Sequence, residues 1–111
     1  MAKYLVLYRS SVDAMQQMSS ATPEQAQEGM LMWLDWASKA GSALADLGAP
    51  LAPAGRVPSG ANGDSGLPIA GFSVLEADSV EAATGLLQGH PHLHAPGAVI
   101  EVLEYLPVPG A

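Results

Sequence analysis

The sequence lacks cysteine and is poor in basic side chains, and each shortage removes a class of function. Because the chain contains no cysteine, disulfide bonds, thiolate metal sites and a cysteine nucleophile are all excluded. Four Lys and Arg residues stand against eleven Asp and Glu residues, which gives a formal net charge of −7. That charge would repel the phosphate groups of nucleic acids and anionic membranes. We therefore expect neither nucleic acid nor membrane as a partner.

Long apolar runs are also missing. No stretch approaches the ~20 apolar residues of a membrane-spanning helix, and the apolar run within residues 1–9 is too short for the core of a signal peptide. The chain is nevertheless 49% hydrophobic and only 14% charged over its 111 residues, which indicates a folded domain. We expect a single soluble, cytoplasmic domain over residues 1–111, with a modest core that favours association with a second copy.

Hydrophobic periodicity predicts six elements in the order strand, helix, strand, strand, helix, strand. The strands are expected at residues 3–9, 51–57, 66–76 and 98–106. The long helix is expected over about 23–47, because Thr22 and Gln25 have the spacing of a capping box and Gly48 has the position of a helix stop. A second helix is expected between a capping box that starts at Asp78 and a left-handed Gly89. The Gly/Ser-rich residues 58–66 are expected to form a flexible loop.

This order of elements is that of the split β-α-β-β-α-β, or ferredoxin-like, unit. It predicts an α+β fold with a four-stranded antiparallel sheet and two helices on one face. The first and last strands are largely apolar on both sides, and a sheet face left bare in a monomer normally marks an interface. We expect the bare face to carry Tyr4, Val6, Tyr8, Phe72 and Val74, and two such faces to pack together in a homodimeric α/β barrel.

Four segments together resemble a known family. They are the opening KYLVLYR, the paired-tryptophan stretch MLMWLDWASKAGSALADLGAP, the segment GFSVLEADSVEAATGLLQGHPHL and the closing VIEVLEYLP. These stretches resemble the YciI-like family of small bacterial proteins, also called YCII-related or DGPF-domain proteins, over nearly the whole chain except the 58–66 loop. The resemblance implies a dimeric ferredoxin-like α/β barrel, and most members of that family have no assigned reaction.

The resemblance also bears on the histidine segment. In the better-described branch of the family, a helix histidine and an aspartate in an Asp-Pro loop have been suggested as an active-site pair. Here His90 and Pro91 stand where that Asp-Pro loop lies, and no histidine precedes His90. The DGPF signature is also missing from the loop before the third strand. The suggested pair is therefore absent from this chain as such.

All three histidines occupy alternate positions of GHPHLHAPG, residues 89–97, and three interpretations are open. His90, His92 and His94 would align on one side of an extended segment and bind zinc or copper. Alternatively, Gly89 ends the preceding helix, His90 caps its last carbonyl groups, and the other two imidazoles are solvated. In the third interpretation His90 is a general acid or base, because imidazole titrates near neutral pH.

The candidate site is a small-molecule pocket between the long helix and the sheet. His90 is its candidate catalytic residue, no metal or cofactor is expected, and the ligand-binding candidates are Tyr8, Trp33, Trp36, Glu76 and His92. Further polar groups that need a partner or solvent are Asp35 and Glu101. The tryptophans also fit core and dimer contacts. Two functions are open: a homodimeric small-molecule site with His90 as acid or base, or a dimeric interaction module without chemistry.

Overall fold

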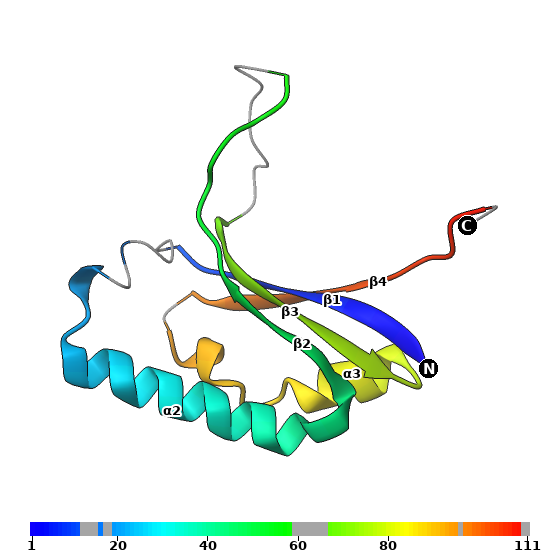
Figure 1. Ribbon diagram of the computed structural model, residues 1–111, viewed down its shortest axis with the longest axis horizontal. Coiled ribbons are helices and arrows are strands. Elements are labelled where there is room, and N and C mark those ends of the chain that lie inside the picture. The colour runs from blue at the N-terminus through cyan, green and yellow to red at the C-terminus, as the bar shows by residue number, and fades with distance from the viewer. Residues whose placement is uncertain (12–15, 17–18, 59–66, 96, 110–111) are drawn as a thin grey trace.

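The computed structural model describes residues 1–11, 16, 19–58, 67–95 and 97–109. In chain order the elements are β1 (Ala2–Arg9), α2 (Pro23–Ala40), the 3-10 turn η1 (Gly41–Ala43), β2 (Leu44–Pro50), β3 (Ile69–Ala77), α3 (Val80–Leu86), the 3-10 turn η2 (Pro91–His94) and β4 (Val99–Glu104). The strands form an antiparallel sheet in the order β2-β3-β1-β4, with α2 and α3 against one face (Figure 1). This α+β arrangement is compatible with the predicted ferredoxin-like fold. Of the predicted loop, all but its first residue lies outside the described residues.

The long helix α2 begins where the sequence predicted and ends earlier. The Thr22 side chain accepts a hydrogen bond from the Gln25 N–H at 3.1 Å, and the Gln25 side chain accepts one from the Thr22 N–H at 2.9 Å. The predicted end near residue 47 is wrong, because the helix ends at Ala40 and Gly41 takes a φ of 59°. Glycine adopts such a positive φ without strain, so Gly41 is where the chain leaves the helix.

Residues 44–50 form the strand β2 rather than the last turns of α2. Leu44 and Leu47 fit a helical spacing, but Gly48 does not stop a helix. Its φ is 80°, and a Cβ at this position would collide with the backbone carbonyl of Phe72 on β3. Glycine is therefore required where β2 approaches β3 so closely. The predicted strand at 51–57 is correspondingly wrong, since these residues lie outside the sheet.

The second helix, α3, is displaced by one residue from its predicted start. Ser79, not Asp78, is the N-cap, and its hydroxyl accepts a hydrogen bond from the Ala82 N–H at 3.1 Å. After the helix, Gly89 has a φ of 71°, which confirms the left-handed glycine. Within the described part of the chain, no helix combines the length and the apolarity needed to cross a membrane.

The register of β1 against β3 decides which residues face the helices. Tyr8 lies opposite Gly71 and Leu7 lies opposite Phe72, and directly opposed residues share a face while neighbours along a strand alternate. Tyr8 and Phe72 therefore project from opposite faces, and the predicted bare face that combined them is wrong. The β1 residues assigned to that face are buried on the helix side, namely Tyr4, Val6 and Tyr8.

Both faces of the sheet carry apolar side chains, as the strand patterns indicated. The core under the helices consists of Val6, Tyr8, Trp36, Ala40, Leu75 and Leu87. The face directed away from the helices, called the open face below, carries Leu5, Leu7, Phe72, Val74, Val99 and Leu103. On β4, Val99 and Leu103 remain 48% and 42% exposed. Neither α2 nor α3 covers this face, because both lie on the other side (Figure 1).

Candidate functional site

The histidine segment is held in place by its own backbone. His90 precedes the turn η2, where Pro91 occupies the first position, and its Nδ1 accepts a hydrogen bond from the His92 N–H at 3.0 Å. The His90 backbone N–H donates to the Leu87 carbonyl at 3.1 Å, so the backbone, not the imidazole, completes the end of α3. The interpretation of the imidazole as a helix cap is therefore wrong.

His90 is enclosed by three aromatic rings, and these four residues are called the aromatic cluster below. The ring of Tyr8 stacks on the imidazole at a centroid distance of 4.9 Å, while Trp33 and Trp36 approach it edgewise at 4.5 and 4.4 Å. Trp36 is fixed in turn, because its Nε1 donates to the Leu86 carbonyl at 2.8 Å. Three elements, β1, α2 and the residues before η2, thus meet around a fully buried imidazole.

Burial determines the charge state of the aromatic cluster. It lowers the pKa of His90 to about 4, with smaller contributions from His92 and His94, and it raises the pKa of Tyr8 to about 12 against the opposing effect of the hydrogen bond between Tyr8 and Ser73. His90 is therefore neutral at physiological pH. Because its Nδ1 accepts an N–H, the ring proton lies on Nε2, and this buried atom has no hydrogen-bond partner among the described residues.

A second buried network runs across the sheet beside the aromatic cluster. The Tyr8 hydroxyl donates to the Ser73 Oγ at 2.8 Å, and that hydroxyl donates to the Leu47 carbonyl at 2.6 Å. Ser73 is fully buried, so these bonds satisfy its hydroxyl without water. They also connect β1, β3 and β2 beside the aromatic cluster, and so hold the sheet side of the site in place.

His92 also contacts Tyr8, with 5.3 Å between the ring centroids, and it is not solvated, contrary to the second interpretation of the histidine segment. It is 9% exposed, and its Nε2 lies 2.8 Å from the Arg9 carbonyl. The Arg9 side chain donates to Glu101 at 2.8 Å and to the Leu67 carbonyl at 2.6 Å. Glu101, whose place in an apolar strand required a partner, has one in this ion pair.

The three histidines do not converge on a common point. His90 is fully buried, His92 is bonded to the backbone of β1, and His94 is exposed. Across the residues described by the structure, no group of three His, Cys, Asp or Glu side chains is arranged to hold a metal ion. Alternation along an extended segment was the basis of the metal interpretation, and the turn η2 removes that alternation.

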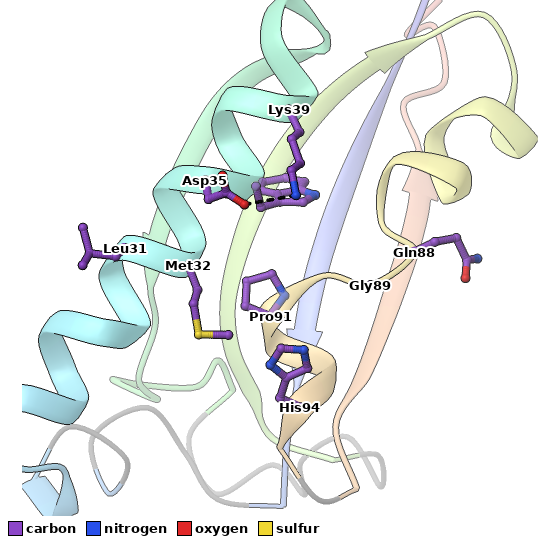
Figure 2. Close-up of a pocket in the computed structure, with 9 residues that line it drawn as sticks. Leu31, Met32, Asp35, Lys39, Gln88, Gly89, Pro91 and His94 are labelled. Atoms are coloured by element: carbon purple, nitrogen blue, oxygen red, sulfur yellow. Dashed lines mark ion pairs between the residues drawn. The ribbon is translucent and has the colours of Figure 1, made fainter.

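An open groove lies between α2 and η2, with a volume of about 410 Å³. Its lining residues are Leu31, Met32, Asp35, Trp36, Lys39, Gln88, Gly89, Pro91 and His94. Figure 2 shows Met32 of α2 directed toward Pro91 and His94 of η2. Asp35 and Lys39 form an ion pair at 3.1 Å on the rim. His90 does not line the groove, although its chain neighbours Gly89 and Pro91 do.

The structure brings together most of the residues that the sequence singled out. Tyr8, Trp33, Trp36 and His92 all have rings within 5.3 Å, centroid to centroid, of another member of this group or of His90. Glu76 is elsewhere, since it lies opposite Lys3 in the register of β3 and β1. The sequence missed Met32 and Lys39, which lie one turn to either side of Trp36. Their helical spacing from that tryptophan is the signal that could have identified them.

The groove has the composition of a small-molecule site. Met32, Trp36 and Pro91 provide an apolar surface, and Asp35, Lys39 and His94 provide a carboxylate, an ammonium and an imidazole around it. No protein-family model matches the chain, and comparison with curated proteins gives no match either. The chemistry of the site therefore follows from its own geometry, which provides binding contacts in the groove and a neutral imidazole behind its wall.

Proposed function

We propose that the chain is a YciI-like protein that binds a small molecule in the groove between α2 and η2 and acts as a homodimer. The observation that carries this proposal is the groove itself. Its volume of about 410 Å³ falls in the range of roughly 300–1,000 Å³ that is usual for ligand sites, and such sites combine an apolar lining with a few polar groups. A ligand with an apolar body and one polar end fits this lining.

His90 supports the groove through its contact with Trp36. Trp36 contacts the imidazole on one side and lines the groove on the other, so the position of His90 sets the position of the groove wall. An acid–base role for His90 stays a prediction, since it requires the buried Nε2 to reach a ligand. The ligand-binding role of Trp36 is part of the proposal, whereas Glu76 lies outside the groove and is not included.

A screen of metabolites by thermal shift, followed by calorimetric titration, tests the groove. A ligand that raises the melting temperature should bind at least about tenfold more weakly to Met32→Trp, because the larger ring fills the groove. Ser38→Trp is the matched control, since it places the same side chain on an exposed position of α2 that does not line the groove. Equal affinity for both variants would show that the ligand binds elsewhere.

The dimer part of the proposal is supported by the open face. Its centre is apolar, and its charged side chains occur in positions of opposite sign, Arg9 bonded to Glu101 and Lys3 opposite Glu76. An apolar centre with a polar rim is the usual anatomy of an interface. Balanced charges also allow the face to meet a second copy of itself without net repulsion.

Sedimentation equilibrium at micromolar concentration tests the dimer. We expect the wild-type chain to sediment as a dimer and Leu103→Glu to shift toward the monomer, because a carboxylate would be buried in the interface. Val80→Glu on α3 is the control, with an exposure of 45% against 42% for Leu103. A monomeric wild-type chain would contradict this part of the proposal.

The second candidate function is a dimeric interaction module without chemistry. The complete enclosure of His90 favours it, because no titratable group of the aromatic cluster meets solvent. A dimer that responds to no ligand in the screen would support this function over the small-molecule site.

A further inference from the structure

A second apolar surface lies along α2 beside the groove, and it shares Leu31 with the groove lining. Met30, Leu31 and Leu34 form this surface, called the helix stripe below, and they are 57%, 59% and 49% exposed. Met30 and Leu34 are four residues apart and Leu31 and Leu34 are three apart, so successive members are neighbours on the helix surface. None of the three residues belongs to the hydrophobic core or is among the described residues that pack against it.

The packing of α2 does not require these side chains. The residues of α2 that belong to or pack against the core are Trp33, Trp36, Ala37 and Ala40, and Met30 and Leu34 border this face of the helix. A polar residue at Met30 or Leu34 would leave that packing intact. Single exposed apolar residues are ordinary, but neighbouring large ones on one helix face are typical of a surface that binds a partner. Methionine also suits such surfaces, because its flexible side chain adapts to the partner.

Acidic side chains accompany the helix stripe. Glu24, Glu28 and Asp35 follow one another at helical spacing beside Leu31, and all three are exposed. The only basic residue of α2 is Lys39, and it is bonded to Asp35. The rim of the stripe is therefore negative, in a chain whose net charge is −7.

This charge distribution discriminates between occupants of the two apolar surfaces. Two copies joined through the helix stripe would bring together three acidic side chains from each copy and only one lysine from each, which is already bonded to Asp35. Such an excess of like charge at an interface disfavours that pairing. The open face differs, because its charged positions alternate in sign. A second copy thus fits the open face, whereas the helix stripe fits a partner with complementary positive charge.

We infer that the helix stripe docks an amphipathic helical segment of another protein, one with an apolar face flanked by Lys or Arg side chains. Apolar side chains of that segment would cover Met30, Leu31 and Leu34, and its basic side chains would meet Glu24, Glu28 and Asp35. Helices recognised along an apolar face are a recurrent binding mode. This inference requires neither a small molecule in the groove nor a dimer, although Leu31 and Asp35 also line the groove.

The experiment uses two labelled helical peptides with the same leucine face, one flanked by lysines and one by glutamates, and the full chain in fluorescence anisotropy. We expect the lysine peptide to bind with micromolar affinity and the glutamate peptide to bind at least about tenfold more weakly. The double variant Met30→Gln/Leu34→Gln should also bind the lysine peptide about tenfold or more weakly than the wild type does. Neither of these two residues lines the groove, so a defect in the groove would not produce this result.

Val80→Gln is the control, because it removes a side chain of similar exposure, 45%, from α3. It should bind the lysine peptide as the wild type does. The variant Glu24→Gln/Glu28→Gln should bind the lysine peptide more weakly than the wild type, and this loss of affinity should be larger at low salt than at high salt. Equal binding of both peptides, or an equal loss in the α2 and α3 variants, would overturn the inference. A change in the sedimentation of Met30→Gln/Leu34→Gln would also overturn it, because a second copy would then be the occupant. Binding to phosphatidylcholine vesicles that depends on the helix stripe would overturn it as well.

Discussion

The inner and outer sides of α2 are both apolar, yet they lie in opposite environments. On the inner side Trp36 is 6% exposed and packs against Tyr8 and His90 through the aromatic cluster. On the outer side Met30 and Leu31 are more than half exposed. The difference teaches that apolar character alone does not distinguish side chains that pack in the core from side chains that bind a partner. The inner side determines stability, and the outer side and the adjacent groove are available for binding.

The histidine segment repeats this contrast within four residues. His90 is fully buried with a lowered pKa, while His94 is exposed on the groove. The turn η2 produces the difference, because it directs the imidazole of His90 under α2 and the imidazole of His94 toward solvent. Substitutions on the two sides should therefore change the free energy of unfolding by different amounts, and these amounts can be ranked.

The largest effect is expected for His90→Ala. Removing the imidazole leaves a cavity between Tyr8, Trp33 and Trp36 and removes the acceptor of the His92 N–H, so we expect a loss of about 2–4 kcal/mol in the free energy of unfolding. His94→Ala is the matched control and should change that free energy by less than ~0.5 kcal/mol. Chemical denaturation followed by tryptophan fluorescence measures both. Equal losses in the two variants would remove the distinction between the inner and outer sides.

An intermediate effect is expected from pH. His90 has a pKa of about 4 in the folded chain and an ordinary value near 6.5 in the unfolded chain. Between these two values the unfolded chain takes up a proton that the folded chain does not. The stabilisation from the neutral His90 is therefore fully present above about pH 6.5 and falls by on the order of 3 kcal/mol as the pH decreases to about 4.

The control for the pH effect is His90→Phe, which keeps an aromatic ring of similar size but cannot titrate. The carboxylates contribute alike to both proteins, so the difference between their stability curves isolates His90. We expect this difference to change across the interval between the two pKa values and to be flat above it. Parallel curves would show that the imidazole titrates alike in the folded and unfolded chains.

The smallest effect is expected for Asp35→Asn on the outer side. The variant breaks the ion pair with Lys39, but the two side chains are 66% and 76% exposed, and exposed ion pairs contribute at most about 0.5–1 kcal/mol. We expect a change of less than ~0.5 kcal/mol in the free energy of unfolding. Trp36→Phe, one residue along the helix, should cost more, because the Leu86 carbonyl loses its donor. The comparison fails if Asp35→Asn is the more destabilising of the two.

The sequence predicted the elements better than their boundaries. Thr22, Gln25 and Gly89 act locally, through hydrogen bonds or backbone angles within a few residues, and the structure confirms all three. The end of α2 was misplaced because Leu44 and Leu47 suit a helix and a strand alike. Only the contact of Gly48 with β3, a residue distant in sequence, decides between them.

The candidate site was predicted in part for the same reason. Tyr8, Trp33 and Trp36 were identified from aromatic character, and the fold places them around His90. The groove was not identified, since it requires α2 and η2 to lie side by side. Glu76 was included from its position beside an apolar strand, but the register directs it away from the groove.

By itself the sequence determined the α+β composition, the capping of α2, the two-sided apolar character of the strands and the acidity of the surface, because each depends on residue type and short-range spacing. Only the tertiary structure decided that Tyr8 belongs to the covered face, that His90 is buried and His94 exposed, and that Met32 and Lys39 border a groove. Those outcomes depend on strand register and on contacts between distant segments. A shift of one residue in the register would exchange the two faces of the sheet, and no local pattern in the chain specifies which alternative is realised.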